Sequence, residues 1–163
     1  MRKKLGRSTD LVKLAEPPEP GGALIFERTF QSSNEAKAEV LEDLLQALAT
    51  ANVFSSTSEE EVNFRLVLDE ALVNAIMHGN KFDSGKTARV RAYVGAGLSA
   101  ISFVVEDQGA GFKEEDLPDP AAPENLLEES GRGVILIRGI MNHVSYWRGG
   151  SVLLMSKTLQ RRS

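Results

Sequence analysis

The sequence predicts an α+β domain, a two-layer sandwich in which helices cover one face of a mixed, mostly antiparallel sheet. Two pairs of segments alternate apolar and polar residues, and glycines separate the members of each pair. Two further segments have the apolar spacing of amphipathic helices, and a third apolar run follows a glycine pair. The resulting order is strand, helix, helix, strand, strand, helix, strand, strand.

The first segment, residues 1–22, is polar and contains EPPEPGG, so we expect a flexible tail followed by one domain over residues 23–163. Residues 23–30 alternate well enough for a first strand. Ser32 and Glu35 form a capping-box pattern, which predicts a helix that continues to about Ala51. Its expected buried residues are Val40, Leu41, Leu44, Leu45 and Leu48.

A second helix is predicted from the serine- and glutamate-rich residues 55–61 to His78, with a left-handed cap at Gly79. Apolar residues cover so much of its circumference that we expect it to be buried. These residues are Val62, Phe64, Leu66, Leu68, Leu72, Val73, Ala75, Ile76 and Met77.

The remaining elements are two hairpins and one helix. Residues 87–94 and 98–106 alternate around a Gly-Ala-Gly turn, and residues 144–147 and 152–159 alternate around Gly149-Gly150. Between the hairpins, residues 113–129 are rich in Pro, Glu and Asp, as expected of a functional or mobile loop. The run VILI at 134–137 fits a buried strand or a helix, and its flanking residues favour the helix.

Composition limits the class of protein. The 163 residues suit one domain with a substantial core, and 42% hydrophobic with 26% charged residues is ordinary for a globular protein. A net charge of −4 predicts no nucleic-acid-binding face. The chain has no cysteine, no signal-peptide pattern and no apolar run of membrane-spanning length, so we expect a cytoplasmic protein that does not bind membranes.

Three short motifs carry the chemistry. In LVLDEALVNAIMHGN (66–80), helical spacing places Glu70, Asn74 and His78 on one side of the second helix. The Asn74 carbonyl oxygen is a ligand of the kind Mg²⁺ accepts, and Glu70 could orient or deprotonate a hydroxyl beside a γ-phosphate. The alternative is a satisfied polar pair that bridges helix and sheet.

The second motif, DQGAG (107–111), follows a predicted strand directly. Its glycines permit close approach of a planar ligand, and the Asp107 carboxylate can accept a hydrogen bond from the adenine amino group. An ordinary Asp/Gly turn is the alternative. In the third motif, Gly131, Arg132 and Gly133 precede the apolar run, where a helix N-terminus and a guanidinium would bind phosphate. The alternative is a glycine-rich helix entry.

In this order, the three motifs resemble the N box and the two glycine boxes of the GHKL superfamily of ATP-binding domains. The resemblance covers about residues 23–159. HGN at 78–80, the LPDP…PEN loop and SGRG followed by an apolar run resemble bacterial anti-sigma-factor serine/threonine kinases in particular. The resemblance implies a Bergerat-type ATP-binding fold, the cofactors ATP and Mg²⁺, a sigma factor and an anti-anti-sigma protein as partners, and a homodimer.

The resemblance also implies residue roles. Glu70 would be the general base, Asn74 the magnesium ligand and Asp107 the adenine ligand, with Gly109 and Gly111 shaping the base pocket. Gly131, Arg132 and Gly133 would bind the phosphates, and residues 113–130 would form a lid. Two positions depart from the family pattern. Asn142 stands where Asp is common, and Ser151 stands where a Thr contacts the adenine pocket.

Two other functions compete with the kinase hypothesis. An anti-sigma protein could use ATP only to set its shape, although a carboxylate at Glu70 beside Asn74 favours catalysis. A histidine-kinase ATP domain would need a phosphoacceptor histidine before the N box. The two histidines, His78 and His143, do not precede it, which disfavours autophosphorylation in cis. We expect His78 to be a packing residue at the helix end.

Overall fold

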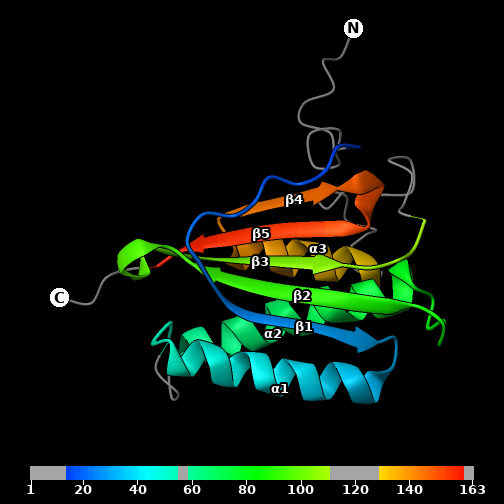
Figure 1. Ribbon diagram of the computed structural model, residues 1–163, viewed down its shortest axis with the longest axis horizontal. Helices are drawn as coiled ribbons and strands as arrows, with labels where there is room; N and C mark the ends of the chain where they lie inside the picture. The colour runs from blue at the N-terminus through cyan, green and yellow to red at the C-terminus, as the bar shows by residue number, and fades with distance from the viewer. Residues whose placement is uncertain (1–13, 55–58, 111–128, 160–163) are drawn as a thin grey trace, which may run out of the picture.

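The computed structural model describes residues 14–54, 59–110 and 129–159 of the chain (Figure 1). Its strands are β1 (Ala23–Gln31), β2 (Thr87–Val94), β3 (Ala100–Glu106), β4 (His143–Trp147) and β5 (Val152–Thr158). Its α-helices are α1 (Asn34–Thr50), α2 (Glu59–Val73) and α3 (Glu129–Ile140). The predicted order of elements is confirmed, including the helix over the ambiguous run.

The strands form a five-stranded sheet in the order β1-β2-β3-β5-β4. Each neighbouring pair is antiparallel, so the sheet is antiparallel rather than mixed. Both predicted hairpins, β2–β3 and β4–β5, are present. Figure 1 shows the three helices on one side of the sheet. The architecture is therefore the predicted two-layer α+β sandwich.

The core lies between the sheet and the helices because strand side chains alternate between the two faces. On β2, the buried residues Ala88, Val90 and Ala92 face the helices. From α2, Phe64 packs edge-on against Phe103 of β3 with ring centroids 6.1 Å apart. Full burial of side chains of this size stabilises the fold by about 1.5–3 kcal/mol each.

The start of α1 differs from the predicted capping box. Ser33 is the N-cap, and its hydroxyl accepts a hydrogen bond from the Ala36 backbone N–H at 3.1 Å. Ser32 is buried instead, and its hydroxyl donates to the Lys86 carbonyl oxygen at 2.8 Å. A distant loop therefore competes for the residue that local pattern assigns to the cap. The five predicted buried residues of α1 are all buried.

The second helix ends differently from the prediction. After α2, residues Asn74–Gly79 form a π-helix, η2, whose C-cap Asn80 has φ −84°. Gly79 is not in a left-handed conformation. Lys81 and Phe82 adopt that conformation instead, although both carry a side chain. The expectation of full burial was wrong for Val62 and Leu66, whose side chains are exposed.

Two short 3₁₀ turns complete the described elements: η3 (Ala96–Leu98) between β2 and β3, and η6 (Arg148–Gly150) between β4 and β5. Within the described ranges, each helix is too short or too polar to cross a bilayer.

Candidate nucleotide-binding site

Glu70 and Asn74 lie beside the second glycine motif. A Cβ atom placed on Gly133 of α3 would overlap the Glu70 Oε2 atom and lie 3.8 Å from Asn74 Nδ2. Gly133 is buried, and with any side chain at this position the end of the Glu70 side chain would have to shift. Glu70 and Asn74 are both half-buried, so neither side chain is sealed inside the core.

His78 differs from Glu70 and Asn74 in its exposure. It lies in the π-helix, which has more residues per turn than an α-helix, so the α-helical spacing used in the sequence prediction does not apply after Asn74. His78 is exposed, so it is not the packing residue we expected. π-Helical segments are frequent at functional sites, and this one separates the Glu70–Asn74 end of the site from the Asp107 end.

Asp107, Gly79 and Gly109 meet at the other end of η2. A Cβ on Gly79 would overlap the Asp107 carboxyl group, with Oδ1 at 2.7 Å, and a Cβ on Gly109 would overlap the Gly79 carbonyl group. The Asp107 Oδ1 atom accepts a hydrogen bond from the Gly109 backbone N–H at 2.8 Å. The glycines thus permit a close contact between the helix end and the loop after β3.

Burial raises the pKa of Asp107 to about 6, against the opposing effects of the Gly109 N–H and the positive charge of Lys86. Desolvation disfavours the charged form of a carboxyl group. A ligand that donates a hydrogen bond to this carboxylate, as an adenine amino group would, stabilises its ionised form.

Asn80 is a site residue that the sequence reasoning did not identify. It is 1% exposed, and its amide nitrogen donates to Ser32 Oγ at 2.8 Å and to the Thr87 carbonyl oxygen at 2.9 Å. Its Oδ1 atom accepts a hydrogen bond from the Gln108 backbone N–H at 2.7 Å. The Gln108 side chain in turn accepts from the Thr87 N–H at 2.7 Å.

Asn80 therefore fixes the loop that follows Asp107 to the start of β2 and to the residues before α1. The available signal in the sequence was an asparagine directly after a predicted helix end. Asparagine is common there for local reasons, and its partners are distant in sequence, so the pattern alone does not distinguish a cap from a tertiary clamp.

The phosphate motif is placed in part. Gly131 and Gly133 lie within α3, which begins at Glu129, so the glycines are not before the helix as predicted but in its first turns. The side chain of Arg132, the position of Gly111 and most of the predicted lid at 113–130 lie outside the described residues.

Ser151 is 5% exposed and contacts Asp107 through its backbone. Its carbonyl oxygen accepts a hydrogen bond from the Asp107 backbone N–H at 2.9 Å, and its hydroxyl donates to the Arg148 carbonyl oxygen at 3.1 Å. Ser151 thus supports the Asp107 loop through its backbone.

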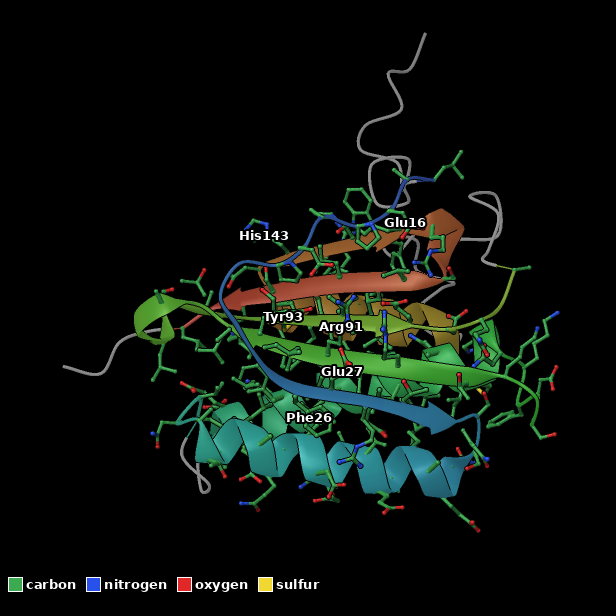
Figure 2. All side chains as sticks on the ribbon, viewed as in Figure 1. Glu16, Phe26, Glu27, Arg91, Tyr93 and His143 are labelled. Carbon is green, nitrogen blue, oxygen red and sulfur yellow. The ribbon has the colours of Figure 1, made fainter. Side chains whose placement is uncertain are left out.

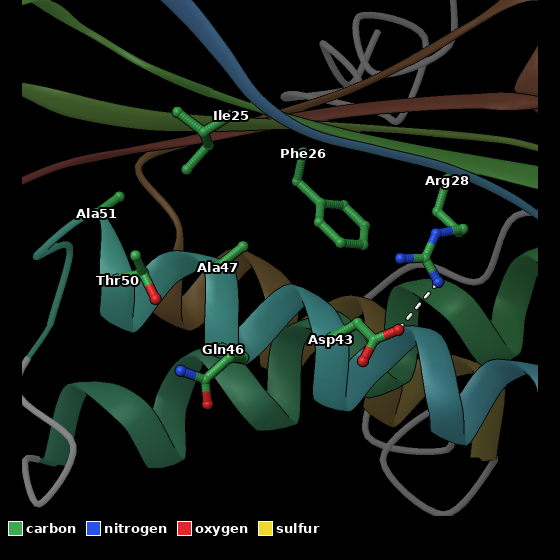
Figure 3. Close-up of a pocket in the computed structure, with 8 residues that line it drawn as sticks. All are labelled: Ile25, Phe26, Arg28, Asp43, Gln46, Ala47, Thr50 and Ala51. Atoms are coloured by element: carbon green, nitrogen blue, oxygen red, sulfur yellow. Dashed lines mark hydrogen bonds and ion pairs between the residues drawn. The ribbon is translucent and has the colours of Figure 1, made fainter.

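A separate open cleft of about 470 Å³ lies between β1 and α1 (Figure 3). The Arg28–Asp43 ion pair, at 2.9 Å, crosses it. None of the predicted site residues lines it. In the part of the chain that the structure describes, no three His, Asp or Glu side chains gather to hold a metal ion. A magnesium ion at Asn74 would therefore take its other ligands from phosphate oxygens and water, as Mg²⁺ usually does.

Fold and site together define a nucleotide-binding domain of the two-layer type. Residues 30–157 match the model of the histidine kinase-like ATPase domain family, and the chain belongs to that family. Membership implies ATP binding.

Relatives within the family include the anti-sigma F factor of Clostridium perfringens (strain SM101 / Type A). It is 30% identical over 110 residues, which cover 63% of this chain and 76% of the relative. The serine-protein kinase RsbW of Bacillus cereus (strain AH820) is 27% identical over 134 residues, covering 77% of this chain and 82% of the relative. The serine-protein kinase RsbW of Bacillus thuringiensis (strain Al Hakam) matches with the same identity and coverage.

Proposed function

We propose that this protein is an ATP-dependent serine/threonine protein kinase that acts as an anti-sigma factor. In this proposal it binds Mg-ATP, sequesters a sigma factor and phosphorylates a serine or threonine of an anti-anti-sigma partner. The observation that carries the proposal is the position of Glu70 and Asn74 against Gly133, with Asp107 against Gly79 at the end of the π-helix that begins at Asn74. The names of the relatives support it.

Each residue has a distinct task in the transfer. Asp107 accepts the adenine amino hydrogen and rejects guanine, which presents an oxygen at that place. The Asn74 carbonyl oxygen would hold a magnesium ion, which neutralises phosphate charge when bound. Gly109 and Gly111 shape the base pocket, and Gly131, Arg132 and Gly133 bound the phosphates. Catalysis is then mainly positioning and charge neutralisation.

Glu70 acts as the general base in the chemical step. Its carboxylate accepts the proton of the substrate hydroxyl as the hydroxyl oxygen forms a bond to the γ-phosphorus. The bond between the γ-phosphorus and the bridging oxygen breaks, and ADP leaves. The proximity of α3 to the Glu70 carboxylate limits the space around this group.

A second function deserves a test because one relative is named as an anti-sigma factor without mention of kinase activity. In this alternative the domain binds ATP and sequesters its partner without phosphotransfer. We further propose that the protein forms a homodimer and that it acts in the cytoplasm.

The test compares two site variants with two surface controls. Glu70→Gln should keep ATP affinity while transfer to a partner falls by roughly 10²–10⁴-fold, the usual contribution of a general base. Asp107→Asn should weaken ATP binding without lowering the free energy of unfolding. Glu39→Gln and Asp83→Asn, which replace exposed carboxyl groups, should change neither property.

The partner would be obtained by pull-down from the source cell with and without Mg-ATP, followed by mapping of phosphorylated serine and threonine. Transfer by Glu70→Gln at the wild-type rate would exclude Glu70 as the base. ATP-dependent capture of a partner that is never phosphorylated would replace the kinase with the sequestering alternative. ATP affinity unchanged by Asp107→Asn would remove the adenine assignment.

A further inference from the structure

Residues 14–22 cross the face of the sheet that the helices leave uncovered (Figure 1). This segment, which we call the strap, contains Glu16 and Glu19. Beneath it, β2 turns Arg91 and Tyr93 toward the outer face, and Figure 2 shows these side chains on the same side of the sheet as Glu16. An apolar cluster of Tyr93, Val104 and Val152 lies on this face, with Trp147 and Leu154 packed against it.

The strap is attached most firmly at Arg148. The Arg148 guanidinium donates to both carboxylate oxygens of Glu16, from Nε at 2.8 Å and from Nη2 at 2.7 Å. The Arg148 backbone N–H also donates to the Ala15 carbonyl oxygen at 2.9 Å. Glu19 makes a looser contact, 3.7 Å from Arg91 Nη1. Side chain and backbone of Arg148 are thus both held by the strap.

Arg148 needs external support because its backbone is unusual. It has φ +48°, in the left-handed region that residues with a side chain rarely adopt. Gly149 and Gly150, which follow, also have positive φ, at 69° and 109°. A non-glycine residue persists in such a conformation only when its surroundings fix it, and the strap supplies two of the contacts that fix Arg148.

The Arg148 turn is connected by hydrogen bonds to Asp107 of the proposed nucleotide site. The Arg148 carbonyl oxygen accepts a hydrogen bond from the Ser151 hydroxyl at 3.1 Å, and the Ser151 carbonyl oxygen accepts one from the Asp107 N–H at 2.9 Å. Arg148 is also connected to Asp107 through Glu106, the residue before Asp107 in the chain. Glu106 is held by Arg89 at 2.8 Å, Arg91 at 2.9 Å and Arg148 at 3.5 Å on the outer face.

We propose that Glu16 and Arg148 are positioning residues of the nucleotide site: the strap fixes the Arg148 turn on the outer face, and the turn holds Asp107 in its binding position on the inner face. The inference rests on the proposed ATP site and adds a regulation to it. Release of the strap, by a partner that competes for Arg148, lowers nucleotide affinity. Conversely, bound nucleotide tightens the strap, because coupling between two sites is reciprocal.

The sign of the effect separates this mechanism from ordinary charge effects. ATP is an anion, so removal of an acidic residue from the protein should strengthen its binding through Coulomb attraction. The strap mechanism requires the opposite for Glu16. Because the Glu16–Arg148 pair is exposed at the surface, the expected change is modest, on the order of two- to fivefold for Glu16→Gln and larger for Glu16→Arg, which the guanidinium repels.

The experiment measures Mg-ATP affinity of the full chain by calorimetry for wild type, Glu16→Gln, Glu16→Arg and Glu19→Gln. Glu19→Gln is the matched control, because it removes the same charge from the same segment and does not contact the Arg148 turn. Its own contacts, 3.7 Å from Arg91 Nη1 and 3.5 Å from the Tyr93 hydroxyl, are longer than those of Glu16. We expect both Glu16 variants to bind ATP more weakly at unchanged unfolding temperature and Glu19→Gln to bind as wild type or slightly tighter. Equal changes in Glu16→Gln and Glu19→Gln, or tighter binding by Glu16→Gln, would overturn the proposal.

A second measurement, hydrogen exchange, compares the variants without nucleotide and the wild type with and without it. Hydrogen exchange at the Arg148 and Asp107 amides should be faster in Glu16→Arg than in wild type, and Mg-ATP should slow exchange of the Arg148 amide in wild type. If wild type fails to bind Mg-ATP, the proposed function fails while the amide comparison still tests the strap. If wild type binds and the Asp107 amide is unaffected by Glu16→Arg, the strap inference fails while the ATP site stands.

Discussion

The Asn80 side-chain oxygen accepts a hydrogen bond from the Gln108 backbone N–H at 2.7 Å, joining the end of the π-helix to the loop that carries Asp107. The two residues are far apart in the chain, and the same Asn80 amide also reaches Ser32 and Thr87. The end of the π-helix and the loop that carries Asp107 are therefore fixed to each other by one buried side chain.

Replacement of Asn80 by alanine should lower the free energy of unfolding by about 2–4 kcal/mol, because it leaves several buried polar groups without a partner. Urea denaturation measures the change. Asn142→Ala is the control, since Asn142 is exposed and its Oδ1 atom accepts one hydrogen bond, from the Thr158 N–H at 2.7 Å. That variant should lose about 1 kcal/mol or less. Equal losses would show that the buried hydrogen bonds of Asn80 contribute no more to stability than the exposed one of Asn142.

Two glycines of α3 should respond differently to alanine. Gly139→Ala adds a methyl group in open space and should stabilise the protein by about 0.5–1 kcal/mol through helix propensity. Gly133→Ala meets the flexible end of the Glu70 side chain, which must move aside, so the gain in stability should be smaller and any phosphotransfer should fall. Thermal unfolding and a transfer assay of both variants check this. Similar stabilisation by both, with activity intact, would mean that α3 does not press on Glu70.

Nucleotide affinity should depend on pH through Asp107. Burial raises the pKa of this carboxyl group from 3.8 to about 6 in the free protein, so below pH 6 a proton competes with the adenine amino group. We expect binding about tenfold weaker at pH 5 than at pH 8. In Asp107→Asn this component should vanish, while the titration of the nucleotide itself remains in both proteins. A pH profile identical in the two proteins would contradict the assignment.

The same shift has a consequence for stability. The folded-state pKa of Asp107 lies above its value in an unfolded chain, so the native protein binds the proton more readily between pH 4 and 6. By linkage, this group opposes folding at pH values above 6, and its cost disappears as the pH falls below 4. Asp107→Asn should therefore be at least as stable as wild type at pH 7, as measured by urea denaturation.

Local pattern was sufficient for the order of the elements and for the motifs. The alternation in residues 87–94 and the glycines of both hairpin turns depend only on neighbours in sequence, and these predictions were confirmed. The core of α1 was predicted residue by residue for the same reason. The errors occurred where contacts with distant residues decide the structure. The Ser32 hydroxyl binds the Lys86 carbonyl oxygen instead of capping α1. Val62 and Leu66 are exposed, although apolar residues cover much of the circumference of their helix.

The sequence by itself determined the α+β class, the three motifs and their correspondence to an ATP-binding family, because periodicity and turn chemistry are local properties. Only the tertiary structure decided which groups meet. It wound the residues after Asn74 into a π-helix and turned His78 outward. It placed Gly133 next to the Glu70 carboxylate and gave the Asn80 side chain hydrogen-bond partners in three other segments. It also placed the Glu16 segment in contact with the Arg148 turn, which supports Asp107. These contacts join residues far apart in the chain, and their energies depend on burial and on geometry that exists only once the layers have packed.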